Sequence, residues 1–444
     1  MRTINYLTDN PARILYSICI PLIGVNLLLW LTTTWTNQLY SRFVGPEAFA
    51  VMGYLSTVTT AFANIVSGVM SAAWIKTARS FALDGKAVCA RQIFHGIAAI
   101  VIADCALAAL LLLCRRPIFA LLHIPEELAS PARTYFVLSI LSYLPVVIAG
   151  LFLTIVNGTS GSARLFWINV AVVLLNYSAA ALLLAGFHTG MVGLALSSGF
   201  GALFQLILDF FLFRRAGFRF SLRQLLRHFD WALVREMIRY GVLIALQTLL
   251  CTSGYLLVAY QTNRFLSQGY ISVLNVALPL TGIMSAFGSA CMAFCPQNYA
   301  ANQPDRMRRF LRLTVVCALI YGTLCFGIYA LLGRWYYRRL LFSEQLTALG
   351  SEYWFWQGVG YLFLSLVYPL RSFFDAIGYS RLSLLSGIGE LLGNTVCALW
   401  LIPRFGNIGR SVSYPLGWLL ACIFLLCAFF VNKKRMFSPF FRPI

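Results

Sequence analysis

The chain has 444 residues, of which 60% are hydrophobic and 11% are charged, and its formal net charge is +20. A soluble domain carries about 25% charged residues, so this composition excludes a soluble protein and indicates an integral membrane protein. The positive charge alone would also suit a nucleic-acid-binding protein, but its distribution along the chain argues against that class.

Twelve apolar stretches run from one end of the chain to the other, each long enough as a helix to cross a hydrocarbon core that needs about 20 residues. Because lipid-exposed backbone must satisfy its own hydrogen bonds, we expect helices and an all-α integral membrane fold. The expected spans are approximately 14–37, 48–75, 93–114, 134–156, 165–187, 190–213, 241–262, 270–294, 313–333, 353–374, 382–402 and 408–431.

Polar and glycine landmarks of the first half recur in the same order in the second half. The corresponding segments are Asn157–Arg164 with Asp375–Arg381, Gly190–Gly193 with Gly406–Gly409, Arg79–Ala82 with Gln297–Ala300, and Arg42–Phe43 with Arg264–Phe265. Their offsets lie near 217 residues, as in Arg164 and Arg381. The pattern predicts two six-helix pseudo-repeats, a plan typical of transporters that alternate between two openings.

The predicted domains are an N-terminal lobe, 1–213, a basic cytoplasmic linker, 214–235, and a C-terminal lobe, 236–444. With both termini cytoplasmic, 24 of the 34 Lys and Arg residues fall on the cytoplasmic side. This is the positive-inside bias of short loops, and it accounts for the net charge by topology and by contact with anionic membrane lipids. We therefore expect a multi-pass protein of the cell (inner) membrane, with its lobes related by a parallel repeat and no nucleic-acid partner.

No catalytic motif stands out in the chain, since it has no HExxH, GxSxG or P-loop pattern and its histidines are isolated in sequence. We expect neither an enzyme nor a metal or organic cofactor. Work must then come from an ion gradient, a partner chain or the gradient of the substrate itself.

Two acids lie well inside expected spans. Glu390 follows Ser386-Gly387-Ile388-Gly389 in the eleventh span, and Asp104 lies in the third span. A buried carboxylate is costly unless it is paired, hydrated or protonated, and it can bind a proton or cation as solvent access alternates. Glu390 and Asp104 are therefore the ion-coupling candidates; the alternative is a structural, hydrogen-bonded acid.

Polar residues at helical spacing mark two equivalent spans. The first carries Asn26, Trp30, Thr33 and Asn37, and the seventh carries Gln247, Cys251, Gly254 and Gln261. Such faces would line a central cavity or, alternatively, join helices by hydrogen bonds. The cleft candidates are Asn26, Trp30, Thr33, Asn37, Asn176, Gln247 and Tyr368.

Several segments resemble the multidrug and toxic compound extrusion (MATE) family of the MOP flippase superfamily. They are Ile20–Ile23 with Asn26, Arg42–Ala48, Gly68 with Arg79, Gly190–Ala195 and Gln297–Asn302. The resemblance covers nearly the whole chain. It implies two six-helix lobes flanking a central cleft, and export of amphipathic, often cationic compounds in exchange for protons or sodium ions. We expect the protein to work as a monomer.

The chain departs from the family pattern where the family's coupling acids are expected. The first-span acid would fall near Thr36, the fifth-span aspartate near Ala180, and two acids of one branch near Cys251 and Leu366. We therefore expect coupling, if it operates, to use other residues. Two alternatives stay open, a flippase for a lipid-linked saccharide and a membrane-embedded enzyme or receptor. Arginines in the cleft would favour the flippase, whereas aromatics and amides would favour drug export.

Overall fold

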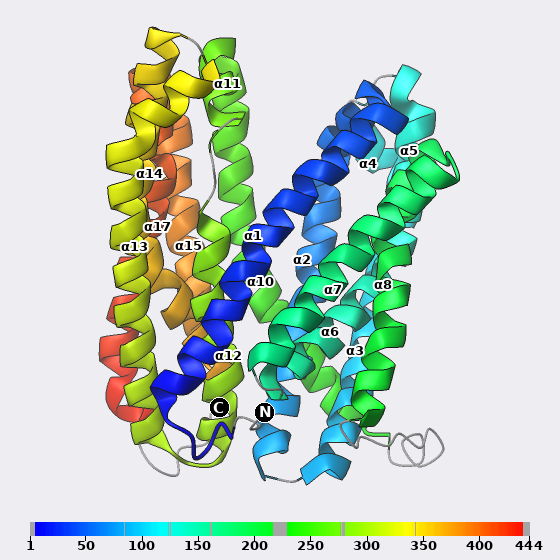
Figure 1. Ribbon diagram of the computed structural model, residues 1–444, viewed down its shortest axis with the longest axis vertical. Helices are drawn as coiled ribbons and strands as arrows, with labels where there is room; N and C mark the ends of the chain where they lie inside the picture. The colour runs from blue at the N-terminus through cyan, green and yellow to red at the C-terminus, as the bar shows by residue number, and fades with distance from the viewer. Residues whose placement is uncertain are drawn as a thin grey trace. The chain divides into compact units, whose positions relative to one another are not determined.

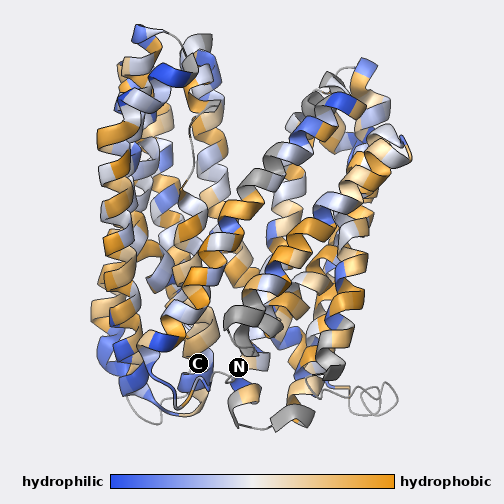
Figure 2. Ribbon diagram, in the orientation of Figure 1, coloured by the Kyte–Doolittle hydropathy of each residue, from blue (hydrophilic) through white to orange (hydrophobic). Residues whose placement is uncertain are grey.

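The computed structural model describes residues 5–437 except 84, 123, 125, 160–161, 216–228, 276, 278–279 and 342. Within these residues all regular structure is helical, and ten helices are long and apolar enough to cross a membrane (Figure 1). Figure 2 shows apolar residues predominating along the middle of many helices. The predicted all-α membrane fold is confirmed. Residues 216–228 of the predicted linker lie outside the described residues, and residues 231–235 form the start of a long helix, Trp231–Phe265.

Two compact units make up the chain, Met1–Asp9 with Ile20–Ala245 and Asn10–Cys19 with Leu246–Ile444, here called unit 1 and unit 2. Unit 1 contains most of α1 and all of the helices up to α8. These are α1 (Pro11–Phe43), α2 (Pro46–Leu83), α3 (Gly85–Leu113), α4 (Arg115–Leu121), α5 (Glu126–Leu141), α6 (Tyr143–Thr159), α7 (Ser162–Ala181), the π-helix η1 (Leu182–Gly186) and α8 (Gly190–Arg215).

Unit 2 takes the first turns of α1 and most of α10. Its helices are α10 (Trp231–Phe265), α11 (Gln268–Asn275), α12 (Thr281–Ala300), α13 (Pro304–Leu341), α14 (Glu344–Ile377), α15 (Ser380–Val396), the π-helix η2 (Cys397–Leu401), α16 (Ile402–Phe405) and α17 (Asn407–Met436). The predicted span 270–294 is thus divided between α11 and α12. The sequence between these helices includes Pro279, which cannot donate a backbone hydrogen bond.

Both halves carry the same local backbone features at nearly the same offset as the sequence repeat. The π-helices η1 and η2 begin at Leu182 and Cys397, 215 residues apart. Gly190 and Gly406 both have positive φ, +55° and +53°, where the chain turns into α8 and α17. Only glycine adopts such angles without steric cost. The repeat seen in the sequence therefore extends to how each half ends its fifth span and enters its sixth.

The core of unit 2 is built around α14, which packs against α12, α13 and α17, while α15 packs against α17 (Figure 1). Gly393 on α15 lies against Gly417 on α17, where a methyl group at position 393 would come within 2.6 Å of the Gly417 Cα atom. Small residues allow helix backbones to approach this closely. The contact fixes the position of α15, and with it the position of Glu390 one turn earlier.

Helix α14 begins with a side-chain cap, and removing the cap is expected to have a modest cost. The Ser343 hydroxyl accepts a hydrogen bond from the Leu346 backbone N–H at 3.4 Å. Ser343→Ala should lower the stability of the detergent-solubilised protein by about 1 kcal/mol, because one N–H at the helix start loses its acceptor. Thermal unfolding checks this, with Ser253→Ala as the control. Ser253 is an exposed residue inside α10, and its hydroxyl donates to the Leu249 carbonyl of the same helix. Equal shifts for both variants would contradict the capping role.

Candidate functional site

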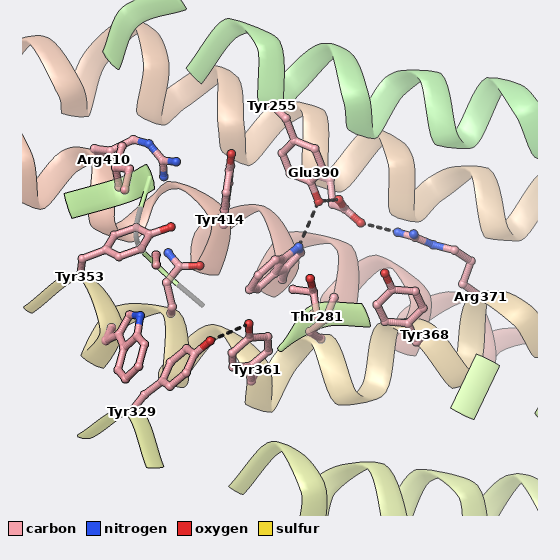
Figure 3. A pocket seen from close by; sticks show the side chains of 16 residues that line it. Tyr255, Thr281, Tyr329, Tyr353, Tyr361, Tyr368, Arg371, Glu390, Arg410 and Tyr414 are labelled. Atoms are coloured by element: carbon pink, nitrogen blue, oxygen red, sulfur yellow. Dashed lines mark hydrogen bonds and ion pairs between the residues drawn. The ribbon is translucent and has the colours of Figure 1, made fainter. Parts of the chain in front are cut away.

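Unit 2 contains a cavity of about 440 Å³. One face of α14 provides much of its wall, because the lining residues follow one another at helical spacing. These are Tyr353, Gln357, Tyr361, Leu364, Tyr368 and Arg371. Helix α17 adds Arg410, Tyr414 and Trp418, again one turn apart. Tyr255 of α10, Thr281 of α12, Tyr329 of α13, Trp354 of α14 and Glu390 of α15 complete the polar and aromatic lining (Figure 3).

At one end of the cavity Glu390 forms an ion pair with Arg371 (Figure 3). The Glu390 side chain is 2% exposed and that of Arg371 is 17% exposed. The second carboxylate oxygen of Glu390 accepts a hydrogen bond from the Tyr255 hydroxyl at 2.6 Å, and Tyr255 in turn accepts one from the Trp418 indole N–H at 3.2 Å. Both oxygens of the buried acid therefore have partners, and four helices are joined through it.

Arg371 is held on its other side by two polar residues. Its Nε donates to the Ser386 hydroxyl at 2.9 Å. When the Gln247 amide is oriented with its oxygen toward Arg371, it accepts hydrogen bonds from Nε and Nη1 at 3.1 Å. This orientation satisfies both groups, since a guanidinium can only donate. The predicted cleft residue Gln247 is therefore a direct partner of the arginine that neutralises Glu390.

Between its two ends the cavity is walled by aromatic rings. Tyr329 stacks on Trp354 with ring centroids 4.4 Å apart, and Tyr361 stacks on Trp418 at 5.9 Å. The hydroxyls of Tyr329 and Tyr361 lie 3.4 Å apart, within hydrogen-bond distance. Stacked and hydrogen-bonded rings present rigid apolar faces together with a few polar tips. Such a wall suits a flat, amphipathic ligand.

Arg410 lies at the other end of the cavity from Arg371 (Figure 3). It is 6% exposed, its guanidinium carbon lies 4.4 Å from the ring centroid of Tyr414, and its Nη1 donates to the Ser413 hydroxyl at 3.1 Å. Its Nε is buried without a hydrogen-bond partner, and within the described part of the chain no carboxylate pairs with it. The cavity thus holds two arginines and one carboxylate.

The cavity brings together three of the residues expected from the sequence. Glu390 and Tyr368 line it, and Gln247 lies beside Arg371. Asp104 belongs to unit 1, where it is 4% exposed on α3 and its Oδ1 has no hydrogen-bond partner among the described residues. The two coupling candidates are thus both buried, but in the described part of the chain only Glu390 has a charged partner.

The remaining cleft candidates lie on helices of unit 1. The side-chain amides of Asn26 and Asn176 donate to carbonyls one turn earlier in their own helices, those of Leu22 and Val172. Asn37 is exposed. The side chains of Trp30 and Thr33 lie outside the described residues. That these residues line a central cleft stays a prediction.

Two arginines of the site were not predicted from the sequence. Arg371 and Arg410 were counted as charges at the membrane faces, yet both line the cavity. One sequence signal indicates the position of Arg371: it lies at helical spacing from Tyr353, Tyr361 and Tyr368, and so on the same face of the helix as these aromatic residues. Among the described residues no group of three or more His, Cys, Asp or Glu side chains could hold a metal ion.

The MatE family model matches residues 21–182 and 244–400, which together make up more than half of the chain. The chain belongs to the MATE family. Members of this family are membrane transporters, so the chain is a membrane transporter. No curated protein matches the sequence.

Solved structures share the fold at low sequence identity. A MATE protein in complex with MaD3S matches with a TM-score of 0.82 at 15% identity, over 97% of each chain. A multidrug resistance MATE family transporter in an outward-facing conformation matches with a TM-score of 0.80 at 15% identity, over 98% of this chain and 99% of that one. A MOP superfamily transporter from Pyrococcus furiosus, described as having a binding pocket of reversed polarity, matches with a TM-score of 0.81 at 15% identity and the same coverage. At such identity the likeness concerns the fold alone.

Proposed function

We propose that this MATE family protein is a secondary active exporter of amphipathic small molecules. It works by alternating access, in antiport with protons or sodium ions, and the cavity of unit 2 is its substrate chamber. The observation that carries the proposal is the buried Glu390, which lines that cavity with its charge held by Arg371. We expect the protein to act as a monomer in the cell (inner) membrane, with both termini cytoplasmic.

The size and lining of the chamber support a small-molecule substrate. A cavity of about 440 Å³ lies within the range of about 300–1,000 Å³ typical of sites for such ligands. Its wall is mostly aromatic, with the Gln357 amide and several tyrosine hydroxyls as polar contacts. Stacking against rigid rings favours flat molecules and tolerates variation in their shape. These features match the aromatic and amide lining expected of a drug exporter.

Coupling is assigned to the Glu390 network. A proton or sodium ion bound at Glu390 cancels the charge that holds Arg371, so the ion pair and the link through Tyr255 to α17 are weakened together. A ligand shifts a conformational equilibrium only by its differential affinity for the two states. An ion that binds Glu390 in one state and leaves it in the other supplies that difference. Asp104, buried in unit 1, is the second candidate.

The second candidate function is a flippase for a lipid-linked saccharide. Arg410 favours it, since a buried guanidinium without a carboxylate suits a pyrophosphate. The Pyrococcus furiosus transporter with a pocket of reversed polarity and a different suggested function is a precedent for such a change within the superfamily. We rank this function second because the aromatic wall and the volume fit a compact ligand better than a long lipid.

The test uses the purified protein in liposomes with two permanently charged, fluorescent probes of matched shape, 2-naphthalenesulfonate and 2-naphthyltrimethylammonium. Neither probe gains or loses a proton, so passive redistribution with pH is avoided. An imposed pH or sodium gradient should drive accumulation of at least one probe above the level in protein-free liposomes, and collapsing the gradient with an ionophore should abolish it. Transport that ignores both gradients would exclude antiport. Growth of expressing cells against a panel of toxic compounds would then extend the substrate range.

A further inference from the structure

The cavity of unit 2 has an unbalanced positive charge. Arg371 and Glu390 neutralise one another at one end, and Arg410 remains at the other end without an acidic partner among the described residues. Burying a charge is costly unless it is paired or hydrated, and a charged residue within a transmembrane segment usually has a function. The tyrosines beside Arg410 contact it through the ring faces of Tyr353 and Tyr414 and through a side-chain hydrogen bond with Tyr353, but they supply no negative charge.

The contacts of Arg410 hold its guanidinium in place and leave hydrogen-bonding capacity unused. Tyr414 lies under it at 4.4 Å and Tyr353 lies 5.7 Å away, measured to the ring centroids. The Tyr353 side chain is also hydrogen-bonded to Arg410, and the Ser413 hydroxyl accepts a hydrogen bond from Nη1. The buried Nε has no acceptor. A guanidinium has five N–H donors arranged for planar, bidentate binding of oxygen anions. The group is therefore oriented, buried and short of acceptors.

We infer that the cavity binds amphipathic aromatic anions or zwitterions, with a carboxylate, sulfonate or phosphate group on Arg410 and the ring system against the tyrosine and tryptophan wall. The inference deepens the proposed function, on which it rests, by giving the charge of the substrate. The aromatic rings between Arg410 and the Glu390–Arg371 pair leave the anionic group and the coupling acid at separate ends of one chamber (Figure 3). An anionic substrate and the coupling cation then do not compete for the Glu390 carboxylate, whereas a cationic substrate would compete with the coupling cation for it.

Binding measured without any gradient tests the charge preference independently of transport. The two naphthyl probes are titrated against purified protein, with quenching of tryptophan fluorescence as the signal, since Trp354 and Trp418 lie in the cavity wall. We expect 2-naphthalenesulfonate to bind at least about tenfold more tightly than 2-naphthyltrimethylammonium. Arg410→Gln should weaken sulfonate binding by about tenfold or more and leave ammonium binding unchanged or improved.

Two further variants separate a binding role from a structural one. Arg410→Lys keeps the charge and should keep the preference for sulfonate, although with lower affinity because the bidentate geometry is lost. Arg404→Gln removes an exposed arginine, stacked on Trp400 just before α17, and should change nothing. If Arg410 were merely structural, Arg410→Gln would lower the melting temperature without altering the ratio of the two affinities.

The possible outcomes are distinct. Equal binding of the two probes, tighter binding of the ammonium, no binding of either probe, or a preference that survives in Arg410→Gln would each overturn the inference. Farnesyl pyrophosphate serves as the lipid probe; if it binds through Arg410 at least about tenfold more tightly than the sulfonate, the anion is a lipid pyrophosphate and the small-molecule assignment falls. If the sulfonate binds through Arg410 but no gradient drives its movement, the inference is supported and the exporter function is rejected. If a gradient drives movement of the ammonium probe alone, the exporter function is supported and the preference for anions is rejected.

Discussion

Replacing Glu390 with glutamine (Glu390→Gln) is expected to reduce gradient-driven transport by about tenfold or more while probe binding persists. Glutamine keeps the shape of the side chain and can still accept a hydrogen bond from Tyr255. It cannot bind a proton or sodium ion as a carboxylate does, so the conformational equilibrium no longer responds to the gradient. Uptake of the naphthyl probes into liposomes, with and without an imposed gradient, measures the loss.

Unfolding of the variant is the main alternative explanation, because Arg371 would lose its partner. Breaking a buried ion pair by removing one side costs about 3–5 kcal/mol, whereas neutralising both sides costs much less. The double variant Glu390→Gln/Arg371→Met should therefore be more stable than Glu390→Gln and equally uncoupled. Recovery of driven transport in the double variant would show that charge imbalance, and not the missing acid, caused the loss.

Glu344 is a matched control for the loss of a carboxylate. It lies exposed at the start of α14, paired with Arg334 and Arg338. The hydrogen bond from Arg334 lowers the pKa of Glu344 below its ordinary value, so this acid is ionised at the pH of the assay. Glu344→Gln should leave transport unchanged, because an exposed ion pair contributes little and lies outside the cavity. Intact gradient-driven transport in Glu390→Gln would remove Glu390 from the coupling mechanism and turn attention to Asp104→Asn.

The fold could be predicted from the sequence because its main determinants are local. Long apolar runs must form helices in lipid, and the repeated landmarks revealed the duplication. The glycines at 190 and 406 were visible as repeat markers, and the structure gives the reason for them, a positive φ at the same turn of each half. The division of the span 270–294 into α11 and α12 was missed, because hydropathy does not register a break in the backbone.

The site was only partly predictable because it depends on contacts between helices. Glu390 stands out in the sequence as an acid in an apolar run, and it is buried in the structure. Arg371 and Arg410 were mistaken for charges at the membrane faces, since a sequence count cannot tell a guanidinium that turns into a cavity from one that turns to water. In the sequence, the tyrosines of α14 look like an ordinary helix-packing face. Only the structure shows that they line a cavity together with residues of α17.

The second large effect is expected at Gly393, where a single methyl group should separate two helices of the site. In Gly393→Ala the new carbon would lie 2.6 Å from the Gly417 Cα atom and 2.8 Å from its backbone nitrogen. Both contacts involve backbone, so α15 and α17 must move apart. Overpacking of this kind costs about 1–3 kcal/mol, and more where no side chain can rearrange. Because α15 carries Glu390 and α17 carries Trp418, we expect loss of thermal stability together with loss of transport.

Gly327→Ala provides the contrasting case, since Gly327 lies inside α13 with nothing within 4 Å of the added methyl group. There the substitution should stabilise the helix by up to about 1 kcal/mol, because alanine has the higher helix propensity. The two variants make the same chemical change and are expected to shift the melting temperature in opposite directions. Equal shifts would show that the close contact between α15 and α17 does not hold the site together. A reverse change at the neighbouring face, Ala421→Gly in the Gly393→Ala background, should recover little, because the clash is with the Gly417 backbone itself.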